Sequence, residues 1–342
     1  MTLGPLMIDL LGKQLLPEER ELLKHPLVGG VILFTKNFES REQIRQLVNE
    51  VRALRSPPLL VAVDYEGGRV QRFRHDFTQI PPMRVLGRAY DQNAAHGLQL
   101  ARQTGWLLAA ELRAVNIDLS LGPVVDLDYG ASSVIGDRAL HHDARVVAEL
   151  AVALMHGMRD AGMHAVAKHF PGHGAVVADS HVAMPVDHRR YADISNDMHP
   201  YARLIENGLG GVMSAHVVFD QVDDVPATFS RRWLKDELRN RLRFKGAVFS
   251  DDLTMEGASI IGTMPQRVSR ALSAGCDMVL ICHRHDAVIQ TFNELSLQPD
   301  PASQVRLAGI RGVTAIDESA LFSSAQWQHA NAVMQSLLSL QG

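Results

Sequence analysis

Short apolar runs alternate with longer amphipathic segments along most of this chain. The apolar runs predict eight strands, at Leu6–Asp9, Gly29–Phe34, Leu59–Val63, Leu119–Val125, Ala165–His169, Gly211–His216, Ala247–Ser250 and Met278–Cys282. Helical spacing of apolar positions predicts helices between them, among which are Arg41–Leu54, Ala94–Val115, Ala144–Ala161, Arg232–Leu242 and Pro265–Ala274. Continuous apolar strands that alternate with amphipathic helices are typical of parallel β/α packing.

The number of these units favours a closed barrel over an open sheet. Eight strand–helix units over roughly 300 residues match a (β/α)8 barrel, whereas open sheets have fewer strands. We therefore predict an α/β protein with a single (β/α)8 barrel of the TIM type over residues 1–297. Residues 298–306 are predicted to form a linker, because they contain Pro299 and Pro301. The remaining tail, which includes Trp327–Leu340, predicts one or two helices packed on the outside of the barrel.

Composition excludes several classes of partner. The 342 residues are 46% hydrophobic and carry a net charge of -4, so no basic field would attract nucleic acid or an anionic membrane. Cys276 and Cys282, the two cysteines, lie in or beside an apolar run and predict neither disulfides nor a four-cysteine zinc site. The N-terminus lacks a basic region and Asp9 interrupts its apolar run, which argues against a signal peptide. We expect a cytoplasmic protein with no membrane span.

Polar side chains follow most of the predicted strands. They are Asp64, Glu66 and Arg69 after the third strand, Asp126 and Asp128 after the fourth, Lys168 and His169 at the fifth, His216 at the sixth, Asp251 and Asp252 at the seventh, and His283 and His285 after the eighth. The carboxyl ends of all strands in a barrel share one face. We therefore expect these groups to converge on a single pocket.

The densest polar stretch is Lys168–Gly174, which is followed by Asp179 and His181. Its glycines and proline place it in a loop after a strand. Residues two apart in an extended loop project to the same side, so the Asp179 carboxylate would orient the His181 imidazole and favour its protonated form. His181 is then a candidate proton donor near neutral pH.

Asp251 is a second candidate for chemistry. An aspartate at the end of a buried strand is costly unless it is hydrogen-bonded or used. It could act as a nucleophile, a base or a metal ligand, whereas we assign its neighbour Asp252 to capping the helix that follows. Arg72, Arg138 and Lys168 are cationic donors that suit hydroxyl-rich or anionic ligands, and Asp64 complements them as an acceptor. Arg69 and Arg74 are interpreted as surface charges.

Cofactor binding is not favoured. Gly67-Gly68 lacks the spacing of both nucleotide-binding glycine motifs. The histidines at strand ends could bind a metal, but the chain has no HExxH motif and no His-x-His after the first strand. We expect neither a metal nor another cofactor, and we interpret His173 as an ordinary loop residue.

Four segments together resemble family 3 glycoside hydrolases, in particular the bacterial β-N-acetylhexosaminidases of peptidoglycan recycling. These are Val63–Arg72, Gly136–Arg138, Lys168–Gly174 with Asp179–His181, and Phe249–Met255. The resemblance spans roughly residues 5–290, in order. Tyr65 departs from the pattern, which has a glutamine there, and this departure concerns the pocket and not the mechanism.

The resemblance implies roles and a function. Asp251 would be the nucleophile and His181, supported by Asp179, the proton donor and acceptor. The terminal N-acetylglucosamine (GlcNAc) would be bound by five residues: Asp64, Arg72, Arg138, Lys168 and His169. The implied enzyme is a retaining exo-β-N-acetylglucosaminidase that acts on muropeptides, as a monomer or weak dimer, with a role in cell-wall biogenesis and hence in cell shape and division. A phosphorylase, a metal-dependent hydrolase and a non-catalytic sugar-binding barrel stay open as alternatives.

Overall fold

The eight predicted strands form one parallel sheet. The computed structural model describes residues 2–177, 184–297, 300–313 and 316–339. The strands of this sheet run in the order β6 (Leu119–Ser120), β3 (Leu60–Val63), β2 (Val28–Leu33), β1 (Leu6–Asp9), β12 (Met278–Ile281), β11 (Ala247–Asp252), β9 (Gly211–Ser214) and β7 (Val166–Phe170). Smaller pairs are the antiparallel β4 (Tyr65–Gly67) with β5 (Val70–Gln71) and the parallel β8 (Val186–Asp187) with β10 (Val218–Phe219).

The two outer strands of this order meet and close the sheet into a (β/α)8 barrel. Val124 bridges to Lys168, and Val166 N donates to Gly122 O at 2.8 Å. The fourth predicted strand is nevertheless shorter than expected, because it ends at Ser120 and not at Val125. Pro123 has no N–H to donate, so the ladder is interrupted there and resumes only as a bridge at Val124.

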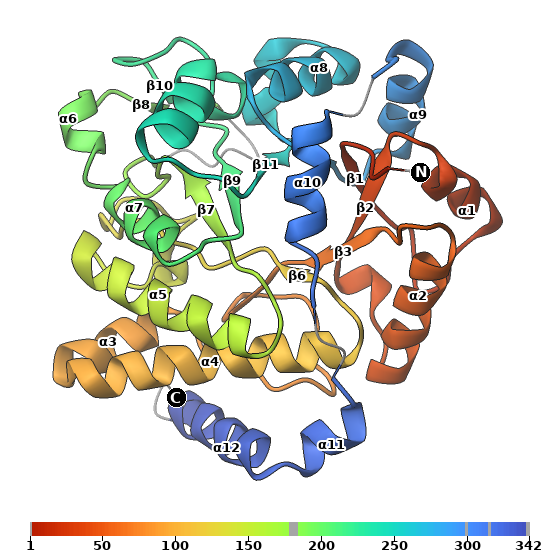
Figure 1. Cartoon of the computed structure of the whole chain (residues 1–342). Coiled ribbons are helices and arrows are strands. Elements are labelled where there is room, and N and C mark those ends of the chain that lie inside the picture. Colours follow the sequence, from red (N-terminus) through yellow and green to blue (C-terminus); the bar gives the residue numbers. More distant parts are fainter. Residues whose placement is uncertain (1, 178–183, 298–299, 314–315, 340–342) are drawn as a thin grey trace.

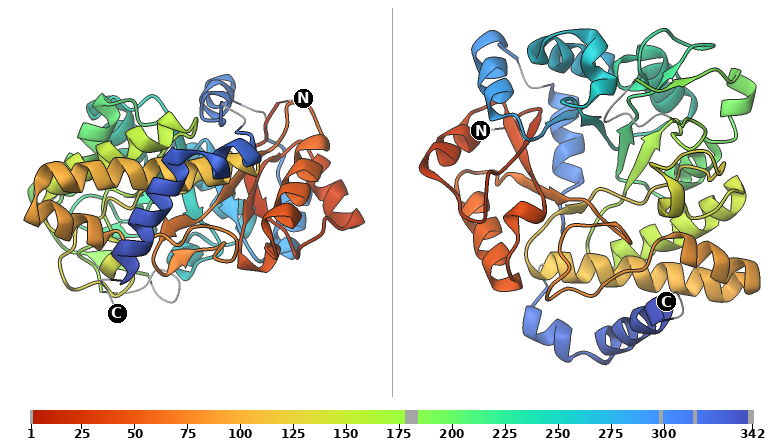
Figure 2. Two further views of the ribbon diagram at one scale, coloured as in Figure 1. Left: turned by 90° about the horizontal axis from the view of Figure 1, so that it is seen from below. Right: turned by 180° about the vertical axis from the view of Figure 1, so that it is seen from behind.

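Helices surround the barrel, as Figures 1 and 2 show. The α-helices are α1 (Pro17–Lys24), α2 (Arg41–Ala53), α3 (Arg84–Gln92), α4 (Ala94–Ala114), α5 (Ala144–Asp160), α6 (Tyr191–Ile194), α7 (His199–Glu206), α8 (Met264–Ala274), α9 (His285–Glu294), α10 (Pro301–Gly309), α11 (Glu318–Ser323) and α12 (Ala325–Ser339). The 3-10 helices are η1 (Thr35–Asn37), η2 (Gly136–Arg138), η3 (Ala227–Phe229) and η5 (Glu256–Ile261), and η4 (Arg232–Arg241) is a π-helix. The five helices named from the sequence are confirmed within about two residues at each end.

Successive side chains along each strand point to opposite faces, which divides the core into the barrel interior and the layer between strands and helices. In β12, Met278 and Leu280 point into the barrel, where they join Ile32 and Phe249, whereas Val279 packs toward the outer helices. Both faces of each strand are therefore buried, which explains why the strands are continuous apolar runs in the sequence.

The linker predicted at residues 298–306 is wrong for residues 301–306, because α10 begins at Pro301. Residues 298–299 lie outside the described ranges. Asp300 caps this helix by accepting from Ala302 N, and proline is well suited to the first helical position. Leu307 and Ile310 are fully buried in the barrel interior. α10 lies in front of the strands in Figure 1 and behind them in the reverse view of Figure 2, so it covers the end of the barrel opposite to the polar strand ends.

The last two helices lie on the outside of the barrel. α11 and α12 pack against α4 (Figure 1), as the sequence predicted for the tail. Their main polar anchor is buried Glu111 on α4, which accepts from Trp327 Nε1 at 2.7 Å. The division of the chain at residue 297 stays a prediction.

Candidate active site

A cavity of about 510 Å³ lies at the carboxyl ends of the barrel strands. Six of the residues singled out in the sequence line it: Asp64, Arg72, Arg138, Lys168, His169 and Asp251. They come from four barrel strands or the loops that follow them, namely β3, β6, β7 and β11, so residues as far apart in sequence as Asp64 and Asp251 meet only because the barrel closes. The predicted convergence of strand-end groups on one pocket is confirmed for Asp64, Glu66, Arg69, Lys168, His169, Asp251, Asp252 and His283, whereas Asp126, Asp128, His216 and His285 do not line the cavity.

Lys168 and Arg138 are held by two carboxylates in a buried ion network. Lys168 Nζ lies 2.8 Å from Asp64 Oδ1 and 2.6 Å from Glu66 Oε1. Arg138 reaches Glu66 with Nε at 2.8 Å and Nη2 at 2.9 Å, which is a bidentate pair. Two cations and two anions balance, so the network offers fixed donors and acceptors without a large net charge.

The charges of this network stabilise one another against burial. Burial raises the pKa of Glu66, but Arg138 and Lys168 outweigh it and hold that pKa well below 4.5. Burial lowers the pKa of Lys168, but Asp64 and Glu66 outweigh it and raise it above 10.5. Glu66, Arg138 and Lys168 are therefore ionised at neutral pH, and as charged groups they make strong hydrogen bonds.

The β4–β5 hairpin places Asp64 and Glu66 at the cavity. Residues two apart in extended backbone face the same side, whereas Tyr65 between them points into the core and lies 6.2 Å, ring to ring, from Phe73. Tyr65 Oη accepts from Gln71 Nε2 at 2.8 Å. Tyr65, which stands where the family pattern has a glutamine, therefore contributes to the packing beneath the hairpin and does not line the cavity.

Asp251 and Asp252 have separate partners at the end of β11. Burial raises the pKa of Asp251, but His169 and His216 outweigh it, so this pKa lies below 3.8 and the carboxylate is ionised. Asp252 accepts from Thr254 Oγ1 at 2.7 Å and from Cys282 N at 3.1 Å. The predicted helix cap at Asp252 is wrong, because Met255 precedes η5 and Asp252 instead stabilises the turn and ties it to β12.

Asp126 orients His169 from below. It lies 2.7 Å from His169 Nδ1 and accepts from the backbone N of His173 at 2.7 Å. Burial raises the pKa of Asp126, but His169 outweighs it and the pKa lies below 3.8. Because Nδ1 faces this carboxylate, Nε2 is the His169 nitrogen left for the cavity.

The glycines after β7 are required for close packing. A Cβ on Gly174 would lie 1.8 Å from Leu127 O, and one on Gly172 would meet the buried Asp197. Asp179 and His181 lie outside the described residues.

Glu66 and Asp126 were expected at the pocket as strand-end groups, but the sequence assigned neither of them a role there. The role of Glu66 could have been inferred, because it is two residues from Asp64 in a segment expected to be extended. Asp126 was noticed as a strand-end residue, but its pairing with His169 depends on the barrel closure between β6 and β7. Within the described ranges, no group of three or more His, Cys, Asp or Glu residues is arranged to hold a metal ion.

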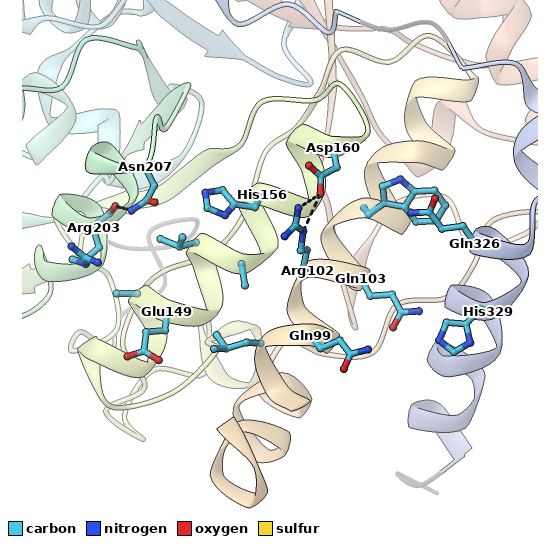
Figure 3. A pocket seen from close by; sticks show the side chains of 15 residues that line it. Gln99, Arg102, Gln103, Glu149, His156, Asp160, Arg203, Asn207, Gln326 and His329 are labelled. Atoms are coloured by element: carbon cyan, nitrogen blue, oxygen red, sulfur yellow. Dashed lines mark hydrogen bonds and ion pairs between the residues drawn. The ribbon is translucent and has the colours of Figure 1, made fainter. Parts of the chain in front are cut away.

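A wider hollow of about 680 Å³ lies on the outer surface between α4, α5 and α12. Figure 3 shows its labelled polar side chains, among which Arg102 pairs with Asp160 at 2.8 Å. Apolar side chains, including Trp106, also line this hollow. It has no cluster of buried ionised groups, so we assign the chemistry to the smaller cavity at the strand ends. No described helix is long and apolar enough to cross a membrane.

Comparisons with known proteins agree with this assignment. Residues 7–305 match the family model of the glycosyl hydrolase family 3 N terminal domain. The chain is 53% identical over 337 residues to the beta-hexosaminidase of Thioalkalivibrio sulfidiphilus, which covers 98% of this chain and 97% of that protein. The crystal structure of NagZ from Neisseria gonorrhoeae in complex with N-trifluoroacetyl-D-glucosamine superposes with a TM-score of 0.94 at 42% identity, covering 98% of each chain. The family 3 β-N-acetylglucosaminidase of Paenibacillus sp. gives a TM-score of 0.86 at 27% identity, covering 97% of this chain and 67% of that one.

Proposed function

The chain belongs to glycosyl hydrolase family 3 and is a glycoside hydrolase, and from this premise we propose that it is a retaining exo-β-N-acetylglucosaminidase. Its proposed substrates are peptidoglycan fragments with a terminal non-reducing GlcNAc, such as those with an anhydro-muramic acid aglycone. The observation that carries the proposal is the ionised Asp251 in a cavity that is also lined by the Asp64–Glu66–Lys168–Arg138 network.

The network would bind the sugar. Asp64 accepts from sugar hydroxyls, and Lys168, Arg138 and Arg72 donate to them, because cationic donors beside a carboxylate suit vicinal hydroxyls. His169, held by Asp126, adds a donor or acceptor at Nε2.

Asp251 would attack the anomeric carbon. Its lowered pKa keeps it ionised, and half-burial limits the water that would stabilise its charge. The bond from C1 to the aglycone oxygen breaks as the bond from C1 to Asp251 forms, and His181 as imidazolium gives its proton to the leaving oxygen. Neutral His181 then takes a proton from water, which cleaves the glycosyl ester with net retention. The role of the Asp179–His181 pair rests on its sequence pattern.

Trapping the intermediate tests the proposal. A 5-fluoro-GlcNAc fluoride should label the wild-type protein, and peptide mass spectrometry should place the label on Asp251. Asp251→Ala should lose both labelling and hydrolysis of aryl β-N-acetylglucosaminides, while Asp286→Asn, at an exposed surface position, should keep both. A label on another residue, or near-wild-type hydrolysis by Asp251→Ala, would contradict the assignment.

The same assay separates the alternatives. A phosphorylase would release GlcNAc 1-phosphate in phosphate buffer, and a metal-dependent hydrolase would lose activity after chelation. We expect free GlcNAc in both buffers and no effect of chelator. We also propose a cytoplasmic location, which cell fractionation tests, and a monomer or weak dimer, which sedimentation tests.

A further inference from the structure

The strand that carries Asp251 runs past the end of its regular pairing. β11 lies between β9 and β12 in the sheet, and its pairing with β9 ends at Ser250, opposite Ser214. On the other side, the register with β12 shifts between Phe249 and Asp252. Such irregularities turn side chains to new directions beside active sites, and this one spans Asp251. The regular ladder therefore does not by itself fix the backbone at the proposed nucleophile.

A histidine side chain contacts the strand where the ladder with β9 ends. His216 stands two residues after the last residue of β9, and its imidazole Nε2 lies 3.0 Å from the backbone O of Asp252. Because a carbonyl oxygen can only accept, Nε2 carries the proton of this hydrogen bond. The backbone N of Asp252 in turn donates to Asp251 Oδ1 at 2.8 Å. The two backbone groups of Asp252 thus join the imidazole to the carboxylate of Asp251.

Packing alone does not require an imidazole at this position. His216 is 0% exposed and stacks on Phe229, with ring centroids 5.8 Å apart and an angle of 7° between the planes. Its Nδ1 is buried and has no hydrogen-bond partner among the described residues. An unmet buried acceptor costs stability, and an apolar ring of similar shape would avoid that cost. The hydrogen bond to Asp252 is therefore the contact that distinguishes histidine from an apolar ring here.

The side chain of Asp252 is held from the opposite neighbouring strand. Its Oδ1 accepts from Cys282 N at 3.1 Å, directly after β12, and from Thr254 N at 3.0 Å. The end of β11 is thus fixed from the β12 side through a carboxylate and from the β9 side through His216. Losing the His216 contact removes only one of these two supports, so we expect the turn to stay folded while Asp251 becomes less well oriented.

We propose that His216 is a positioning residue, which acts through the backbone of Asp252 to fix Asp251 Oδ1 and leaves Oδ2 to attack the anomeric carbon. This inference deepens the proposed glycosidase function and rests on it. His216 does not line the cavity, so it acts without touching the sugar. Orientation of a nucleophile governs the rate of bond formation and not the binding of the sugar. The step affected is therefore the formation of the glycosyl ester.

Two amide replacements separate the two nitrogens of the ring. The side-chain nitrogen of glutamine reaches the place of Nε2, whereas that of asparagine reaches only the place of Nδ1. His216→Asn should lower the saturating rate of labelling by 5-fluoro-GlcNAc fluoride about tenfold, the size of one lost hydrogen bond. The reagent concentration that gives half of this rate should stay at the wild-type value. His216→Gln should recover most of the labelling rate.

A matched control comes from the other end of the pocket. His285 Nε2 lies 2.9 Å from the backbone O of Asp9 and so holds a strand-end carbonyl in the same manner, but at β1. His285→Asn should therefore lower the melting temperature by a similar amount as His216→Asn and leave the labelling rate unchanged. His216→Phe keeps the ring packing against Phe229 and removes the donor, so it should label as slowly as His216→Asn.

The possible failures are distinguishable. If the wild-type protein is not labelled at Asp251, the proposed function fails. If it is labelled, and His216→Asn and His216→Phe react at the wild-type rate, or His216→Gln reacts as slowly as His216→Asn, the positioning role alone is refuted. Failure of all three variants to fold would make His216 a structural residue and would also overturn this role.

Discussion

Replacing Glu66 by glutamine tests whether the buried ion network is a unit. Glu66 has two hydrogen bonds from Arg138 and one ion pair with Lys168, all within 2.9 Å. Glu66→Gln preserves the shape but leaves two buried cations facing only Asp64. Removing one partner of a buried pair costs about 3–5 kcal/mol, because the remaining charge is left uncompensated.

The expected change in melting temperature follows from the size of the chain. Unfolding entropy is about 2.1 cal/mol/K per residue, which for 342 residues is roughly 0.7 kcal/mol/K. A loss of about 3–5 kcal/mol therefore lowers the melting temperature by about 4–7 °C. Calorimetry of wild type, Glu66→Gln and the exposed control Glu39→Gln, which is 63% exposed, measures this shift. A melting temperature of Glu66→Gln equal to that of wild type would refute the network as a stabilising unit.

The stability difference between wild type and Glu66→Gln should also depend on pH in a defined direction. The folded pKa of Glu66 is depressed, so its contribution to stability is present above the unfolded pKa of about 4.3 and is lost as pH falls toward the folded value. The stability difference between wild type and Glu66→Gln should be constant from about pH 5 to pH 8 and should shrink below about pH 4. A difference that grows on acidification would contradict the assigned charges.

Three further predictions concern other parts of the molecule. Asp252 has a pKa raised to about 6, above its unfolded value of about 3.9, so wild type should lose stability as pH rises from about 4 to about 6 and level off above that, while Asp252→Asn should not, in denaturant titrations at each pH. Leu307→Ala should lower unfolding free energy by about 2–5 kcal/mol with unchanged kcat at low temperature, and equal stability would refute the burial of α10. Asp126→Asn should lower kcat/KM on aryl substrates by disorienting His169, and a wild-type value would remove Asp126 from the site.

Much of this architecture follows from apolar periodicity. The strands are visible as continuous runs because both of their faces are buried, and six site residues could be named because each stands at or after a strand end. Helix α10 was not predicted, because Pro299 before it and Pro301 at its first position favour a loop, and only the buried Leu307 and Ile310 reveal its role.

Pairing between distant residues could not be predicted. The Asp9–Lys36–His283 contacts join β1, η1 and the end of β12, and they depend on β1 lying between β2 and β12 in the sheet. Asp126 likewise meets His169 only because the barrel closes between β6 and β7. Local sequence signals carry neither the strand order nor the register that produces these contacts.

The helix that covers the end of the barrel has a consequence for synthesis. Gln304 on α10 bonds to both the N and the O of Leu3, and Leu307 and Ile310 fill the space beneath strands made much earlier. Until residue 310 has left the ribosome, the apolar interior of the barrel is open to water at that end. The nascent barrel therefore exposes apolar surface during nearly all of its translation. Ribosome-bound chains truncated before α10 should recruit chaperones that full-length chains release.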